Sequence, residues 1–128
     1  MNLLLDTHTV FWSLIEPQKL SSQARQAIAS SANDVCVSTA SLWEMAIKVG
    51  LGKWPEAASL VTNFELEMQT VKFSVLSISI PHARQAGLMT AAHRDPFDRL
   101  LAAQAMIEGL TLVTSDSRMA PLGAAVLW

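Results

Sequence analysis

The sequence predicts an α/β fold, in which helices cover both faces of a mainly parallel central sheet to give a three-layer sandwich. Short apolar segments alternate with longer helix-like segments along the chain, which is the order expected for parallel strands joined by helices. The run Leu3–Leu5 is apolar without alternation, as in a strand covered on both sides. Of the 128 residues, 51% are hydrophobic and 16% charged, so we expect residues 1–128 to form a single domain with a substantial core.

Local signals place the individual elements. Asp6 is a helix-start residue directly after the first strand, and Pro17 ends the helix that follows. Pro81 and Pro96 each suit the first turn of a helix. The predicted helices cover residues 7–15, 20–31, 39–51, 56–71, 81–89 and 95–109, the predicted strands cover 3–5, 35–38, 75–80, 110–114 and 125–128, and residues 116–122 are a loop or short helix.

Composition restricts the classes of function. The formal net charge of −2 means that any phosphate-binding surface must be local. Cys36 is the one cysteine, so no intrachain disulfide can form, which fits a reducing, cytoplasmic compartment. The sequence shows no signal-peptide pattern and no apolar run near the roughly 20 residues needed to span a membrane.

Two acidic residues follow predicted strands. Asp6 comes directly after Leu3–Leu5, and Asp116 follows the strand that ends at Thr114. Each has a local explanation, because Asp6 can cap a helix and Asp116 can stabilise a turn. In open α/β sheets, however, ligands bind beyond the carboxyl ends of the strands, where both residues are expected.

A third acid, Glu44, lies near the start of a helix that is otherwise almost wholly apolar. Ser41 and Glu44 match a capping box, and Glu44 also has Lys48 one helical turn ahead as an ion-pair partner. A helix that is apolar all round is normally buried, and a buried carboxylate needs a partner. Lys48 or a metal ion could be that partner, and the sequence leaves both open.

Two aspartates near the start of the helix 95–109 are expected to differ. Asp95 precedes a proline and is assigned to helix capping. Asp98 shares the apolar stripe of Leu101, whereas Gln104 and Glu108 mark the expected solvent face. Asp98 therefore lies at the tip of a core-facing stripe, which favours a functional role.

The four acids Asp6, Glu44, Asp98 and Asp116 can converge at one end of the sheet. Converging carboxylates repel one another unless a cation neutralises them. Oxygen donors without a cysteine or histidine pair suit Mg²⁺ or Mn²⁺, and such an ion can activate water and bind a phosphodiester oxygen. Nearby cations that could hold substrate phosphates are Lys48, Arg94, Arg99 and Arg118.

The chain resembles the PIN-domain ribonucleases, and specifically the VapC-type toxins of prokaryotic toxin–antitoxin pairs. The segments that carry the resemblance are LLLDTH at Asp6, SLWEMAIKVGLGK at Glu44, HRDPFDRLLAAQA at Asp98 and LVTSD at Asp116. The resemblance implies a PIN-like fold and an acidic quartet, formed by these four residues, that binds Mg²⁺ or Mn²⁺. Thr7, Thr114 and Ser115 would support the quartet, and Lys48 and Arg99 would support it or hold substrate phosphate. The family often has a longer segment where this chain has Thr114–Asp116, so the role of Asp116 stays open.

The resemblance also implies an activity and partners. These are endonucleolytic cleavage of RNA to leave a 5′-phosphate and a 3′-hydroxyl, a homodimer, and a small antitoxin that inserts a segment near the site. Trp12, Trp43 and Trp54 could anchor an interface, although large aromatic residues also fill cores.

Two other hypotheses remain. One is a receiver-like signalling domain that binds Mg²⁺ and accepts a phosphoryl group, but no lysine follows the strand 110–114 as such a site usually requires. The other is a non-catalytic PIN-fold interaction module, against which the complete acidic set argues.

Overall fold

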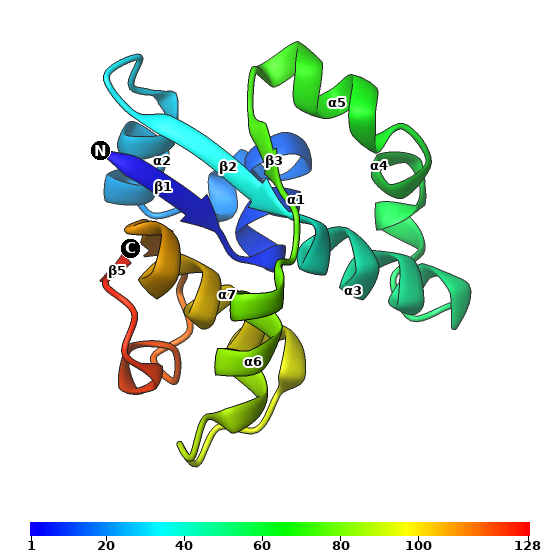
Figure 1. Cartoon of the computed structure of the whole chain (residues 1–128). Coiled ribbons are helices and arrows are strands. Elements are labelled where there is room, and N and C mark those ends of the chain that lie inside the picture. The colour runs from blue at the N-terminus through cyan, green and yellow to red at the C-terminus, as the bar shows by residue number, and fades with distance from the viewer.

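A five-stranded parallel sheet forms the middle layer of the structure, a computed structural model that describes residues 1–128 (Figure 1). The strand order is β3-β2-β1-β4-β5, and every neighbouring pair is parallel. The strands are β1 (Asn2–Leu5), β2 (Asp34–Ser38), β3 (Ser74–Leu76), β4 (Thr111–Val113) and β5 (Val126–Leu127). The chain builds outward from β1 through β2 to β3 and then returns to the other side of β1 as β4. The point where the order reverses therefore lies between β1 and β4, where ligands collect in such sheets.

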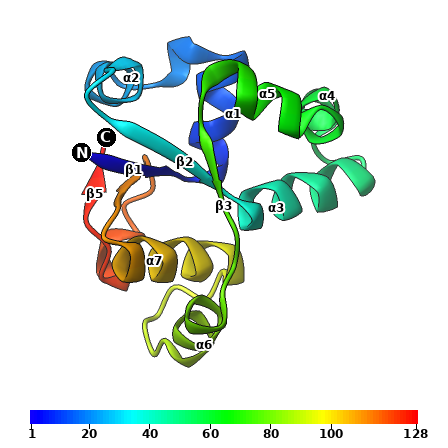
Figure 2. The ribbon, with the colours of Figure 1, turned by 45° about the horizontal axis from the view of Figure 1, so that its top comes forward.

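Helices cover both faces of this sheet, which confirms the predicted three-layer α/β/α sandwich (Figure 2). The helices are α1 (Thr7–Ile15), α2 (Ser22–Ala29), α3 (Thr39–Gly50), α4 (Ala58–Thr62), α5 (Phe64–Val71), α6 (Ile80–Leu88) and α7 (Pro96–Glu108), with 3-10 turns at Pro17–Lys19, Pro55–Ala57 and Ala120–Leu122. Helices α1, α2, α4 and α5 lie on one side, and α7 lies on the other with α6 packed outside it. No helix is both long and apolar enough to cross a membrane.

Alternate residues of β1 build two separate cores. Leu3 and Leu5 belong to the core beneath α1, α2 and α5, where they join Phe11 and Phe64. Leu4 points to the opposite face and packs with the apolar stripe of α7. All three leucines are completely buried, which explains why β1 has no polar alternation.

Two element predictions were wrong in extent. The predicted helix 56–71 is a 3-10 turn and two helices, because the chain breaks at Asn63, whose side-chain amide donates to the Ser59 carbonyl at 3.1 Å. The predicted strand 75–80 pairs only through Ser74–Leu76. Its remaining residues leave the sheet because Ser79 caps α6, where Ser79 and His82 form a capping box.

Two local interpretations are also corrected. Gln104, expected on the solvent face of its helix, is completely buried, because α6 packs on that side of α7. Its amide lies 3.4 Å from both the Ser77 carbonyl and His82 Nδ1. Ser41 and Glu44 do not form a capping box, since α3 begins at Thr39 and its N-cap is Ser38, three residues before Ser41.

We predict that Cys36 reacts slowly with alkylating reagents. Burial, with a smaller contribution from Glu108, raises the pKa of its thiol to about 11. At pH 9 the folded protein should therefore react roughly tenfold or more slowly with iodoacetamide than the urea-unfolded chain. The shift also lowers folding stability as pH rises above 9, because only the unfolded chain then loses this proton. Equal alkylation rates in both states, or an equal high-pH loss of stability in Cys36→Ala, would contradict this.

Candidate active site

Asp6 joins three segments at the carboxyl ends of β1 and β4. As the N-cap of α1, its Oδ1 accepts the backbone N–H of Thr9 at 3.0 Å. The Thr9 hydroxyl lies 3.0 Å from the same oxygen and from the Val113 carbonyl of β4. The Thr114 hydroxyl donates to Oδ2 of Asp6. These bonds fix the carboxylate and leave a lone pair free on Oδ2, because each carboxylate oxygen can accept two bonds and Oδ2 receives only one.

Asp116 follows β4 and is positioned through Thr114. Its backbone N–H donates to the Thr114 hydroxyl at 3.0 Å, so one hydroxyl links Asp116 to Asp6. The Arg118 guanidinium donates to both oxygens of Asp116, at 3.0 Å from Nε to Oδ1 and 2.7 Å from Nη2 to Oδ2. These bonds lower the pKa of Asp116 to about 2 and keep it ionised at neutral pH.

Glu44 enters the site from the second turn of α3. It is buried, and Lys48 donates to its Oε2 at 2.9 Å, so the predicted ion pair is present. The buried hydroxyl of Thr7 donates to Ser41 at 3.0 Å and thereby ties α1 to α3. This bond holds the two helices that supply Asp6 and Glu44 against each other.

Asp98 lies in the first turn of α7, and the structure separates it from Asp95 as predicted. Asp95 is the N-cap, accepting the backbone N–H groups of Phe97 and Asp98. Asp98 is partly buried, and burial raises the pKa of its carboxyl. The hydrogen bond from His93 Nε2, at 2.6 Å, opposes that rise. Because burial disfavours the ionised carboxylate, a nearby positive charge is needed to stabilise the charged form of Asp98.

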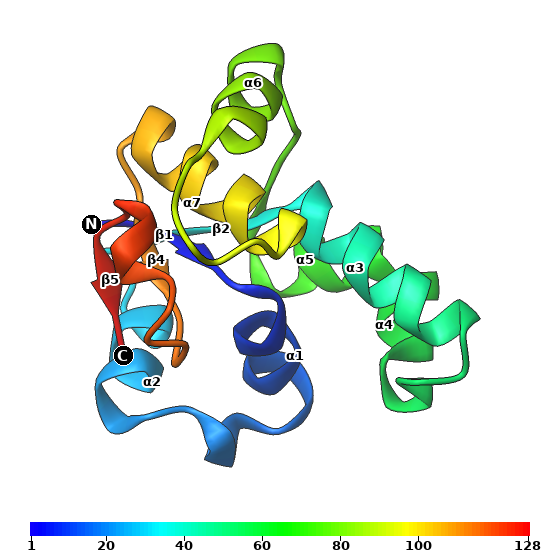
Figure 3. The ribbon, with the colours of Figure 1, turned by 90° about the horizontal axis from the view of Figure 1, so that it is seen from below.

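All four acids line one polar cleft of about 430 Å³ at the carboxyl edge of the sheet. The end of β1 and the starts of α3 and α7 meet at this edge (Figure 3). The residues around the cleft are Asp6, Thr7, His8, Trp12, Glu44, Lys48, Asp95, Asp98, Ser115, Asp116 and Arg118. Five carboxylates thus face two cations, and this excess of negative charge favours binding of a divalent cation.

Comparison of the whole sequence with known protein families agrees with this fold and this set of acids. The chain matches the PIN domain family over residues 3–124, a span that contains all four acids. The chain belongs to the PIN-domain family. The matched residues include almost all of strands β1 to β4, helices α1 to α7 and every residue that lines the cleft.

Individual relatives of this PIN domain cover nearly its whole length. Ribonuclease VapC22 of Mycobacterium tuberculosis is 32% identical over 117 residues, which are 91% of this chain and 88% of that protein. The crystal structure of VapBC2 from Rickettsia felis, bound to a DNA fragment from its promoter, has a TM-score of 0.72 at 16% identity, covering 99% of this chain and 98% of that one. FitAcB from Neisseria gonorrhoeae has a TM-score of 0.66 at 23% identity, covering 98% and 96%. At these identities the two structures establish the fold.

The donors in this PIN domain fit a hard divalent cation. His93, Asp98 and Asp116 each offer a ligand atom, and these atoms lie within 4.8 Å of one another. Asp6 and Glu44 line the same cleft and would complete an oxygen-rich set. Such a set matches Mg²⁺ or Mn²⁺ better than softer metals. Arg118 would have to share Asp116 with the ion.

The supporting residues predicted from sequence divide into two groups. Thr7, Lys48 and Ser115 line the cleft, and Thr114 bonds Asp6 from behind it. Arg99 does not reach the cleft, so its predicted role in holding phosphate is corrected. Its guanidinium donates instead to the carbonyls of Met89, Ala91 and His93, at 2.8, 2.9 and 2.9 Å.

Sequence reasoning overlooked His93, which belongs to the segment that Arg99 holds. The two residues form a chain of contacts, since Arg99 bonds the His93 carbonyl while the His93 ring bonds Asp98. A single histidine gave no metal-ligand spacing, so its place in the HRDPFDR segment was the one available signal. His8 and Trp12 were also not assigned to the site, although both line the cleft.

We predict that Arg99→Lys loosens the segment 89–93 and weakens metal binding. A lysine cannot donate to three separate carbonyls in the planar geometry that the guanidinium provides. Amide hydrogen exchange in residues 89–94 should accelerate, and Mn²⁺ affinity measured by calorimetry should fall about tenfold, the low end for loss of an outer partner. Arg94→Lys, an exposed change in the same segment, serves as the control. Unchanged exchange and affinity in Arg99→Lys would show that Arg99 does not position His93.

Proposed function

We propose that this PIN domain is a Mg²⁺- or Mn²⁺-dependent endoribonuclease and acts as the toxin of a toxin–antitoxin pair. The observation that carries the proposal is the convergence of Asp6, Glu44, Asp98 and Asp116, from four separate segments, on one cleft. The 32% identity to Ribonuclease VapC22 over most of both chains supports RNA as the substrate. We assign metal binding to these four acids, and we treat residues 1–128 as one domain because both cores share β1.

In the proposed reaction, the acidic side chains of the cleft hold the metal ion and the basic side chains bind the substrate phosphate. A bound Mg²⁺ or Mn²⁺ ion would activate water and neutralise charge that develops on the phosphodiester. Asp6 and Asp98 are held by hydrogen bonds and so can keep a fixed geometry toward the ion. Lys48 and Arg118 line the cleft and can attract and orient a substrate phosphate. Attack of water on the phosphorus, with cleavage of the P–O3′ bond and protonation of the departing 3′-oxygen, would leave a 5′-phosphate and a 3′-hydroxyl.

The structure argues against the two alternative functions, a receiver-like signalling domain and a non-catalytic interaction module. A receiver-like phosphoacceptor site would need a lysine after β4, but that strand is followed by Thr114, Ser115 and Asp116, and the four lysines lie earlier in the chain. A non-catalytic module would not need four acids from separate segments to converge on one cleft, since helix capping and ion pairing explain each acid only singly. Metal-dependent hydrolysis accounts for their convergence.

We predict that Asp6→Asn and Asp98→Asn each reduce RNA cleavage by at least about 100-fold, since removing a ligand should cost more than removing its outer partner. Loss of the negative charge should also abolish Mn²⁺ binding in calorimetry. The fold should persist, because asparagine remains a good N-cap at position 6. EDTA should stop cleavage by the unaltered protein, and added Mg²⁺ or Mn²⁺ should restore it.

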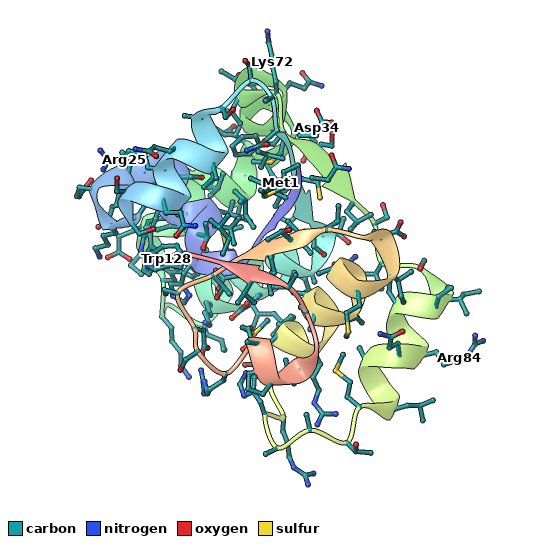
Figure 4. The ribbon with its side chains drawn as sticks, turned by 90° about the vertical axis from the view of Figure 1, so that its left-hand side faces the viewer. Met1, Arg25, Asp34, Lys72, Arg84 and Trp128 are labelled. Atoms are coloured by element: carbon teal, nitrogen blue, oxygen red, sulfur yellow. The ribbon has the colours of Figure 1, made fainter.

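Two control variants sharpen this experiment. Asp34→Asn makes the same chemical change at the opposite edge of the sheet, where Asp34 lies near Met1 (Figure 4). Asp95→Asn removes a charge beside Asp98 but keeps a capping side chain, so it should retain most activity. EDTA-resistant cleavage, or full activity of Asp98→Asn, would refute the proposal.

The structural relatives also indicate a protein partner, and the proposed substrate indicates where the protein acts. We propose a small antitoxin protein as one partner, supported by structural relatives that were solved as VapBC and FitAcB. An RNA substrate and a free thiol at Cys36 support a cytoplasmic location.

We further propose a homodimer that is formed through α3. Trp43 and Ile47 on this helix and Leu51 at its C-cap follow one another at four-residue spacing and are 56%, 38% and 63% exposed. Phe97 extends this apolar stripe, with its ring 5.2 Å from that of Trp43. A contiguous exposed stripe of this kind is typical of a protein interface. Trp12 and Trp54, by contrast, are half-buried against the core.

We predict that the double variant with Trp43→Glu and Ile47→Glu is monomeric at micromolar concentration, because two charges would be buried in the contact. Sedimentation velocity would measure the change in mass. Leu66→Glu places the same charge on an equally exposed leucine of α5 and should leave the dimer intact. A monomeric unaltered protein, or a double variant that still dimerises, would exclude this interface.

A further inference from the structure

A second, smaller hollow of about 290 Å³ adjoins the acidic cleft. It is lined by His8, Lys48, Lys53 and Trp54. His8 and Lys48 also line the cleft, so the two hollows share a wall. A strand whose phosphate lies in the cleft could therefore place a neighbouring group in the second hollow.

The wall between the hollows is an aromatic stack. The exposed ring of His8 stacks on Trp54, with centroids 4.9 Å apart and an interplanar angle of 24°. Trp54 in turn contacts the buried ring of Phe11, at 5.0 Å between centroids. His8 is thus backed by Trp54 and Phe11, its ring also lies 5.6 Å from that of Trp12 at an interplanar angle of 49°, and the exposed residue lines both hollows.

The turn after α3 fixes Trp54 and Lys53 in this position. Gly52 adopts a φ of 72°, which lets the chain reverse at the end of the helix. The backbone N–H groups of Lys53 and Trp54 then both donate to the Lys48 carbonyl, at 2.8 and 3.3 Å. Lys48 Nζ lies 5.6 Å from the centroid of the Trp54 ring.

The positive charges of the hollow differ in availability. Lys48 is paired with Glu44 of the cleft. Lys53 is exposed and belongs to none of the ion pairs of the structure. An aromatic face beside a free cation is the combination by which proteins hold unpaired nucleic-acid bases and their phosphates.

We propose that this hollow, which we call the His8–Trp54 shelf, binds a nucleobase of single-stranded RNA, stacked on His8 and flanked by a phosphate at Lys53. The base belongs to a nucleotide next to the phosphate held in the acidic cleft. The proposal rests on the proposed ribonuclease function and extends it to the recognition of unpaired RNA. A duplex cannot use the shelf, because its bases are not free to stack on a side chain.

The test uses full-length protein and short single-stranded RNAs that carry 2-aminopurine at one position. Asp98→Asn blocks cleavage, and binding is measured in this background by fluorescence. Adding His8→Ala should weaken binding about 5- to 100-fold, the range expected for one lost base stack. It should also remove the quenching of 2-aminopurine at one position, whereas His8→Phe should restore both.

Further controls separate charge, folding and metal binding. Lys53→Ala should weaken RNA binding, whereas Lys72→Ala, an exposed lysine at the end of α5, should not (Figure 4). His8→Ala on its own should remain folded, with only a small fall in melting temperature from the lost stack on Trp54, and should keep its Mn²⁺ affinity, because His8 supplies none of the clustered ligand atoms.

The outcomes distinguish the two proposals. If the unaltered protein cleaves RNA and His8→Ala binds and cleaves single strands equally well, the shelf proposal fails while the ribonuclease stands. If the protein does not cleave but His8→Ala still loses binding and quenching, the ribonuclease proposal fails and the shelf stands. If His8→Ala impairs only the capture of an antitoxin peptide, the shelf is a protein-binding surface and our proposal is overturned.

Discussion

The hydrogen bonds around the Asp6 carboxylate are the interactions on which the rest of the site depends. Through them one side chain caps α1, receives the Thr114 hydroxyl from the end of β4, and still faces the cleft. Capping and function are therefore not alternatives at this position. The backbone amides and hydroxyls that satisfy the carboxylate also hold it at the point where the strand order reverses, and this is where a doubly wound sheet leaves room for a ligand.

The four acids of the cleft differ in whether a cationic side chain already neutralises them, and this difference decides which acids would hold a metal ion most strongly. Arg118 already stabilises the charge of Asp116, and Lys48 that of Glu44. Asp98 has only the His93 ring, and burial raises its pKa. A divalent ion would therefore gain most from Asp98 and Asp6, whose charges have no cationic side chain bonded to them. The ion would gain less from Asp116, which it must share with Arg118.

The sequence predicted a residue's role where the residues that determine it are close in the chain, and it failed where the partners are distant in the chain. Asp6 and Asp116 were found because the end of an apolar strand is visible in a short window, and the parallel sheet brings such ends together. The structure also confirmed the assignment of Asp95 as a cap, since the signal lies within two residues. Gln104 and Arg99 were misjudged because their partners come from residues 77–82 and 89–93, and helical periodicity carries no information on what packs against a polar face.

At the start of α1, three successive residues serve the acidic cleft, the packing of α1 on α3 and the proposed RNA-binding shelf. Asp6 points into the cleft, Thr7 turns inward to Ser41, and His8 stacks outward on Trp54. Thr7 and His8 diverge by about 100° because they are successive residues of the helix, and Asp6 precedes the helix as its N-cap, so the three side chains face different surroundings. The inward contact fixes α1 against α3, and this contact sets the spacing between the acidic cleft and the shelf. A base on His8 and a phosphate beside Asp6 would therefore be held at a distance that the protein determines before RNA binds, which lowers the entropic cost of alignment.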